Sequence, residues 1–194
     1  MKIRRVTTGH TELGKAVVVS DGEVDADTLG LMPGYEFHRL WGADVPPAFP
    51  NGGLQPECPG YFPPLGGFRF MMFTVAPQPA PNQIGSDRQA LFAEMKVKLP
   101  GLAEHMELST PGMHTTDTVD FEYIVSGEVW LELDDGATVH LRAGDTVVQN
   151  GTRHAWRNRG TEPCRVVVFM VGVHRNPSGL DVALASTHSL PSER

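Results

Sequence analysis

Short apolar runs separated by turn residues fill the second half of the chain. Gly, Asp or Asn residues lie between most of the runs, which cover 105–109, 121–125, 129–133, 138–141, 146–149, 154–158 and 165–173. Strands that recur about every 8–12 residues are typical of an antiparallel sandwich or barrel. The pattern therefore predicts an all-β domain from about residue 105 to residue 175.

The first half of the chain has fewer strand signals. Apolar runs at 16–19 and 68–75 predict two strands, and Asp21-Gly22 predicts a turn after the first of them. Eleven prolines fall between Pro33 and Pro81. Since proline cannot donate to a central strand ladder, we expect loops and edge strands in this zone.

One helix is predicted over residues 86–99. Ser86 and Gln89 have the spacing of a capping box, and apolar residues follow at near-helical intervals up to Leu99. Pro100 and the glycine after it end the pattern. We expect this helix to pack on the outside of a sheet.

These elements divide the chain into three parts. Residues 1–104 are an N-terminal extension of strands, Pro-rich loops and the helix, residues 105–175 form the barrel, and 176–194 are a polar tail. The 40% hydrophobic and 20% charged content of the 194 residues is typical of a globular protein.

Charge and cysteine content exclude several classes of protein. The net charge of −7 leaves no broad basic face, so a nucleic-acid-binding function is not expected. No apolar run approaches the roughly 20 residues of a membrane span, so we expect no membrane association. Cys58 and Cys164 are expected to be free thiols in a reducing cytoplasm.

Two segments, 111–127 and 144–158, carry the candidate chemistry. The first holds His114, Asp120 and Glu122 before Gly127, and the second holds Gly144, His154 and Asn158. Together the segments resemble the two sequence motifs of the cupin superfamily.

The resemblance has two departures. His114 matches the first histidine of the family's first motif, and Asp120, seven residues before Gly127, takes the place of the metal-binding Glu. Thr116 occupies the position of the second histidine, and Gln149 the position of a proline in the second motif.

The resemblance implies a double-stranded β-helix, or jelly-roll barrel, with the extension and one peripheral helix outside it. It also implies a divalent metal (Fe, Mn, Ni or Zn) held by His114, Asp120 and His154. Alternate residues of a strand share a face, so Glu122 should lie beside Asp120 as a fourth ligand or a catalytic base.

Two functions remain open. One is a metal-dependent enzyme for a small molecule, of lyase, decarboxylase, isomerase or dioxygenase type; the other is a metal-free barrel that binds a small ligand without catalysis. The missing second histidine favours the latter, and the three retained donors favour the former. We also expect a homodimer, paired through spare strands around 16–19 and 165–173.

Two further polar residues have expected roles. Asn158 is predicted to fix a turn rather than to touch a substrate. Arg69 lies within the apolar run at 68–75, so it is either an inward, anion-binding group or part of the outward half of the strand, which is the simpler interpretation.

Overall fold

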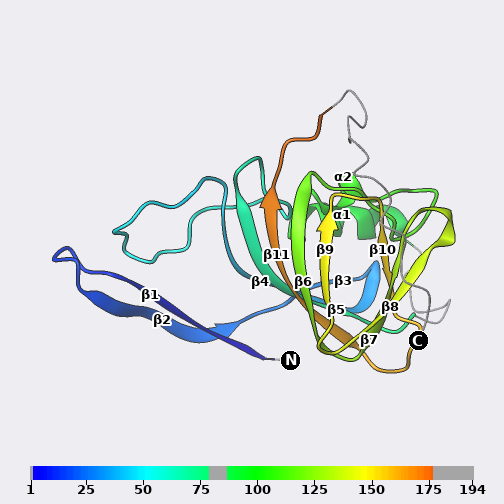
Figure 1. The fold of residues 1–194 in the computed structure, drawn as a ribbon, viewed down its shortest axis with the longest axis horizontal. Coiled ribbons are helices and arrows are strands. Elements are labelled where there is room, and N and C mark those ends of the chain that lie inside the picture. Colours follow the sequence, from blue (N-terminus) through cyan, green and yellow to red (C-terminus); the bar gives the residue numbers. More distant parts are fainter. Residues whose placement is uncertain (1, 79–86, 177–194) are drawn as a thin grey trace, which may run out of the picture.

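The protein is described here by a computed structural model that covers residues 2–78 and 87–176 (Figure 1). Its strands are β1 (Ile3–His10), β2 (Ala16–Val24), β3 (Asp27–Leu29), β4 (Met32–Ala43), β5 (Phe68–Val75), β6 (Thr118–Ser126), β7 (Glu128–Glu132), β8 (Thr138–Arg142), β9 (Thr146–Asn150), β10 (Ala155–Arg157) and β11 (Cys164–Gly172). The helices are α1 (Arg88–Lys98), α2 (Leu102–His105) and a 3₁₀ turn, η1 (Asp134–Gly136).

Two antiparallel sheets form the barrel and confirm the all-β jelly-roll prediction. The larger sheet has the order β3-β4-β5-β11-β6-β9, and the smaller has the order β10-β7-β8. The short helices α1 and α2 lie together beside the sheets (Figure 1). Period-two alternation along β6 and β11 buries every second side chain between the sheets, so one face of each strand lines the interior.

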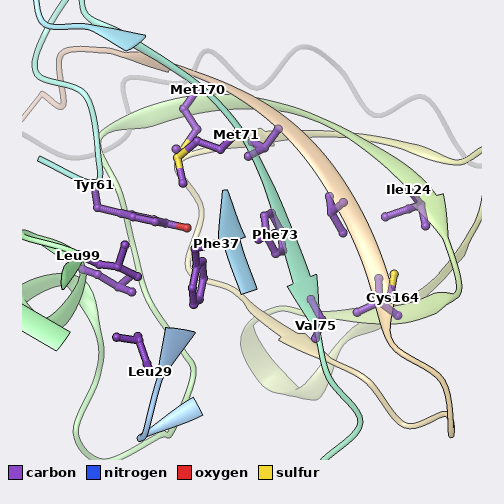
Figure 2. Close-up of a cluster of buried hydrophobic side chains, with 14 of the residues drawn as sticks. Leu29, Phe37, Tyr61, Met71, Phe73, Val75, Leu99, Ile124, Cys164 and Met170 are labelled. Carbon is purple, nitrogen blue, oxygen red and sulfur yellow. The ribbon is translucent and has the colours of Figure 1, made fainter. Parts of the chain in front are cut away.

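The interior is packed with aliphatic and aromatic side chains from both halves of the chain. Ile124, Val166 and Val75 are fully buried there. Figure 2 shows Tyr61, from the loop before β5, among Phe37, Leu99 and Met170. The loop between β4 and β5, residues 44–67, is called the Pro-rich loop here. It therefore contributes a side chain to the core as well as connecting the two strands.

The N-terminal extension supplies strands to the barrel itself. β5 pairs with β11 along its whole length, from Phe68 opposite Val171 to Val75 opposite Cys164. β4 lies between β3 and β5, so the expectation of only loops and edge strands in the Pro-rich zone is wrong there. Pro33 is the second residue of β4 and the next proline, Pro46, follows its end, so proline interrupts little of the ladder.

Two local predictions are also wrong. No strand forms at 105–109: His105 is the last residue of α2, which the buried Leu102 anchors to the core, and Met106 makes only an isolated bridge to His114. Asp21-Gly22 lies inside β2, because the chain reverses earlier, at Gly14, where the backbone φ is 73°. That left-handed conformation favours glycine.

Strand β11 offers no free edge for the homodimer pairing expected around 165–173. It is a central strand between β5 and β6. Its apolar residues alternate between the core and the exposed side of the sheet, as in the buried Val168 and the 39% exposed Phe169. The homodimer itself stays a prediction.

Helix α1 and the tail fall partly outside the described residues. Asp87 caps α1 by accepting a hydrogen bond from the Ala90 N–H at 3.0 Å, whereas Ser86, the predicted cap, is not described. The tail prediction also lies outside them, from residue 177 onward. Within the described ranges, no helix has both the length and the apolar character needed to cross a bilayer. Cys58 and Cys164 are free thiols, as expected.

Strands β1 and β2 form a hairpin that projects from the barrel, called the arm here (residues 3–24). The two strands pair only with each other and make a separate sheet. Figure 1 shows the arm in blue, extending away from the barrel beside the loop that follows β4. Every residue of β2 from Ala16 to Glu23 is exposed.

Candidate functional site

A cavity of about 350 Å³ opens into the barrel. Its walls are largely aromatic and apolar, with Phe37, Phe62, Phe73 and Trp156 among the lining side chains. The polar lining includes the four residues singled out in the sequence, His114, Asp120, Glu122 and His154. Strand alternation and the motif spacing thus brought all four to one cavity.

His114 and His154 form an imidazole pair. Their backbones exchange two hydrogen bonds of 3.0 Å across an isolated bridge, which holds the residues side by side. The ring centroids lie 4.2 Å apart. Nδ1 of His114 lies 3.1 Å from the carbonyl oxygen of Gly112, and Nδ1 of His154 lies 2.9 Å from that of Thr152. With each Nδ1–H donating to a carbonyl, each Nε2 keeps its lone pair.

Burial keeps both imidazoles neutral at physiological pH. It is the main cause of a His154 pKa lowered to about 4, and the neighbouring His114 lowers it further. Burial likewise lowers the pKa of His114. The pair therefore offers the cavity two uncharged nitrogen acceptors.

Asp120 and Glu122 form a second polar cluster on β6. They are two residues apart on the inward face of the strand and are only 4% and 5% exposed. Oδ1 of Asp120 and Oε2 of Glu122 are buried with no hydrogen-bond partner among the described residues. Buried carboxyl oxygens without partners are costly, so these two atoms are available to a ligand in the cavity.

Burial favours the protonated form of both members of the carboxyl pair. Burial raises the pKa of Asp120 to about 6, against a hydrogen bond from Thr118 that favours the ionised form. Burial, and then the charge of Asp120, raises the pKa of Glu122 well above its usual value. Burial therefore favours the protonated form of both carboxyls, and the charge of Asp120 favours it further at Glu122.

Thr116, at the position of the family's second histidine, takes no part in the imidazole pair. Its hydroxyl is buried and lies 2.8 Å from the hydroxyl of Thr118, which in turn interacts with Asp120. Where the family motif has a histidine nitrogen that can bind a metal, this chain therefore has a threonine hydroxyl. That hydroxyl contacts Thr118, which hydrogen-bonds to Asp120 of the carboxyl pair.

The four polar residues do not assemble into a three-donor metal centre. Among the described residues, no group of three His, Cys, Asp or Glu side chains could hold a metal ion. The imidazole pair and the carboxyl pair are separate clusters on one cavity. The metal-ligand set His114, Asp120 and His154 stays a prediction.

Asn158 has the anchoring contacts expected of it, although it also borders the cavity. Its side-chain amide donates to the carbonyl oxygens of Val75 at 2.9 Å and Glu162 at 2.8 Å, and its Oδ1 accepts from the Gly160 N–H at 2.9 Å. These bonds tie the turn after β10 to the end of β5.

Arg69 departs from the simpler expectation. It is 2% exposed, pairs with Asp44 at 2.6 Å and donates to the carbonyl oxygens of Gly60, Ala43 and Phe68. The outward interpretation is wrong, because the Pro-rich loop folds over this end of β5 and satisfies the guanidinium.

The sequence did not identify the aromatic residues that the first half of the chain brings to the cavity. Tyr35, Tyr61 and Phe62 line it from β4 and the Pro-rich loop. The carboxyl pair lies close enough to Tyr61 to add to the effect of burial in raising the pKa of its hydroxyl. No motif marks these positions, since they depend on where the loop packs.

Comparisons with known proteins agree with the motifs. The family model described as "Cupin domain" matches residues 105–170. The chain is 41% identical over 58 residues to "Phomopsin biosynthesis cluster protein C'" of Diaporthe leptostromiformis, covering 30% of this chain and 31% of that protein. It is 33% identical over 98 residues to "Oryzines biosynthesis cluster protein J" of Aspergillus oryzae, covering 46% and 55%.

Among solved structures, the chain is similar to a predicted oxalate decarboxylase from Thermotoga maritima. The similarity covers 77% of this chain and 94% of that one, with 13% identity and a TM-score of 0.42. The chain spans from about a third to about half of the length of the two fungal relatives, 31% and 55%.

Proposed function

This chain belongs to the cupin superfamily through its domain at residues 105–170, and from that premise we propose that its barrel binds a small, largely apolar organic molecule and transfers protons to and from it. The observation that carries the proposal is the makeup of the cavity. Aromatic walls surround two neutral imidazoles and two buried carboxyls, and burial raises the pKa of both carboxyls.

The cavity favours a compact ligand with few polar groups. Its volume of about 350 Å³ lies near the lower end of small-molecule sites. Burial of a ring or alkyl surface of the ligand against the apolar walls contributes favourable binding free energy. The imidazole nitrogens accept hydrogen bonds, and protonated Glu122 donates one, so hydroxyl and carbonyl groups of the ligand would be matched.

The carboxyl pair suits enolisation of a carbonyl compound. The Asp120 carboxylate would take a proton from the carbon next to the carbonyl, while the Glu122 carboxyl would give its proton to the carbonyl oxygen. Return of a proton to another carbon completes an isomerisation, and loss of a leaving group completes a lyase reaction. A pKa of about 6 suits Asp120 to this exchange near neutral pH.

The relatives agree with a small-molecule substrate. Two of them carry names that place them in biosynthesis clusters, for phomopsin and for oryzines. The substrate of this chain would accordingly be an organic intermediate with an activated C–H bond, a class that the proton chemistry defines without naming a compound.

Deuterium exchange tests the proposal. A panel of cyclic 1,3-diketones and aromatic ketones would be incubated with the protein in D₂O, with incorporation followed by NMR and binding by thermal shift. We expect faster exchange at the carbon next to the carbonyl for at least one compound, and an Asp120→Asn rate lower by roughly 100-fold or more.

The exposed turn residue Asp135 gives the matched control, because Asp135→Asn removes a carboxylate outside the cavity. It should retain the wild-type rate. Equal exchange in wild type and Asp120→Asn, for a compound that shifts the melting temperature, would contradict proton transfer but leave binding intact.

One observation favours a second candidate, a metal-dependent enzyme. His114 and His154 lie side by side with Nδ1 bound to the backbone, as in many metal-ligating histidines. Protein purified without a histidine tag would be tested for Fe, Mn, Ni and Zn and for a melting temperature that rises with each metal at pH 7.5. A rise that His154→Ala abolishes would replace the acid–base proposal with the metal-dependent one.

A further inference from the structure

Tyr61 is a buried tyrosine that the proposed proton transfer does not use. It lines the cavity from the Pro-rich loop and is 7% exposed. Figure 2 shows its ring reaching from the loop toward the middle of the core, with the hydroxyl at the inner end. Within residues 2–78 and 87–176, this hydroxyl has no hydrogen-bond partner. It is therefore a polar group that a ligand in the cavity can satisfy.

The ring of Tyr61 is held in place by its backbone and by its neighbours. The Tyr61 N–H donates to the carbonyl oxygen of Pro100 at 2.7 Å, which ties this part of the loop to the turn after α1. Edge-to-face contacts join the ring to Phe37 and Phe62, with centroid distances of 5.9 and 4.9 Å and interplanar angles of 85° and 89°. The hydroxyl thus has a defined position before a ligand enters.

The carboxyl pair borders the same part of the cavity as this hydroxyl. After burial, the charges of Asp120 and Glu122 are the next causes that raise the pKa of Tyr61. Because electrostatic effects weaken with distance, the hydroxyl lies near both carboxyls. Oδ1 of Asp120 and Oε2 of Glu122 also lack a hydrogen-bond partner among the described residues. One ligand could therefore contact the hydroxyl and the carboxyl pair together.

The protonation state of Tyr61 suits it to donate a hydrogen bond. Its raised pKa keeps the phenol neutral throughout the physiological pH range, so the hydroxyl retains its proton. Tyr35, another tyrosine at the cavity, is influenced by a different group. Burial raises its pKa, and the charge of Arg157 lowers it. Tyr61 is thus the tyrosine whose hydroxyl the carboxyl pair affects.

We propose that Tyr61 is a catalytic residue, whose hydroxyl donates a hydrogen bond to the ligand oxygen on which negative charge develops. This inference rests on the proposed function, in which the Asp120 carboxylate takes a proton from the carbon next to a carbonyl. The electron pair of that C–H bond forms a carbon–carbon double bond, and negative charge moves to the carbonyl oxygen. Tyr61 stabilises this charge beside the Glu122 carboxyl and keeps its own proton, so the proton balance is unchanged.

Tyr61→Phe tests the proposal because it removes the hydroxyl and keeps the ring. In the deuterium-exchange assay, the maximal rate should fall by roughly 100-fold or more, as for loss of one donor to a developing oxyanion. The melting temperature should equal or exceed that of the wild type, since a buried hydroxyl without a protein partner adds no stability. A hydroxyl with a purely structural role would instead lower the melting temperature.

Tyr123→Phe is the matched control, because it removes a phenol hydroxyl outside the cavity. Tyr123 is 47% exposed and lies on the outward side of β6. Its variant should exchange deuterium at the wild-type rate, and circular dichroism should show that both variants are folded.

A binding measurement separates this inference from the proton transfer itself. 2-Naphthol presents an oxygen on a flat ring, as an enolate does, and naphthalene has the same ring system without the oxygen. Titrations followed by ligand fluorescence would give both dissociation constants. Tyr61→Phe should raise the dissociation constant of 2-naphthol by roughly 10-fold or more and leave that of naphthalene unchanged.

The two assays distinguish the possible outcomes. Equal binding of 2-naphthol by the wild type and by folded Tyr61→Phe would overturn the inference. A wild-type exchange rate in Tyr61→Phe would also overturn it, and the proton transfer would stand if Asp120→Asn had lost exchange. Weaker 2-naphthol binding by Tyr61→Phe, with no exchange by the wild type, would support the contact with the ligand oxygen and reject the proton transfer.

Discussion

Asn158 provides a test of how the barrel positions its cavity wall. Asn158→Ala removes three hydrogen bonds, to the carbonyls of Val75 and Glu162 and from the Gly160 N–H. Val75 is fully buried, so its carbonyl would lose its partner away from water, whereas Glu162 lies in an exposed turn. An unsatisfied buried group costs about 1–3 kcal/mol and each of the other bonds about 0.5–1 kcal/mol.

The expected loss of unfolding free energy is therefore about 3 kcal/mol. For a chain of this size, that corresponds to a melting temperature lower by roughly 6–12 °C. Urea denaturation followed by tryptophan fluorescence would measure the free energy, and a constant m-value would show that the unfolding transition is unchanged.

The control for this measurement is Asn150→Ala, at an exposed position on β9. Surface substitutions of this kind change stability by about 0.5 kcal/mol or less. If Asn158→Ala were no more destabilising than Asn150→Ala, the three bonds would contribute nothing measurable, and the assignment of Asn158 as an anchor would be refuted.

Two more predictions concern buried charge. Folding raises the pKa of Asp120 from 3.8 to about 6, so its contribution to stability is fully present below pH 3.8 and is lost as the pH rises through 6. The unfolding free energy of Asp120→Asn should thus exceed that of the wild type by up to about 3 kcal/mol at pH 8 and be nearly equal to it at pH 4. Urea titrations that show the same difference at both pH values would contradict this prediction. Arg69→Met leaves Asp44 and three carbonyls without their donor and should lower the unfolding free energy, measured by thermal unfolding, by about 3 kcal/mol or more. Asp44 is half-exposed, so Asp44→Asn should cost less, and an equal loss in the two variants would contradict the prediction.

The sequence predicted those parts of the fold that depend on local pattern. β5 was predicted from its apolar run at the residues where it lies, 68–75. His114, Asp120, Glu122 and His154 were assigned to one cavity because motif spacing and strand alternation are local properties too.

The remaining features depend on long-range packing. β4 was not predicted, because the prolines from Pro33 to Pro81 indicated loops and edge strands, although a proline at a strand's second residue interrupts little of it. The burial of Arg69 and the contribution of Tyr61 to the cavity both require the Pro-rich loop to fold over β5 and the core. The contact between the two imidazoles and the coupling between the two carboxyls depend on how the side chains pack, which residue spacing does not determine.

Strand β6 has a consequence for engineering this protein. Its even-numbered residues Asp120 and Glu122 face the cavity, and its odd-numbered residues Phe121 and Tyr123 face outward. Substitutions at the even-numbered positions can therefore alter the cavity, and substitutions at the odd-numbered positions can alter the exposed surface of the sheet, as two separate sequence libraries. A single-residue insertion or deletion cannot keep the two effects apart, because it would exchange the two sets of side chains, placing phenylalanine in the barrel and carboxylates on the exposed side of the sheet.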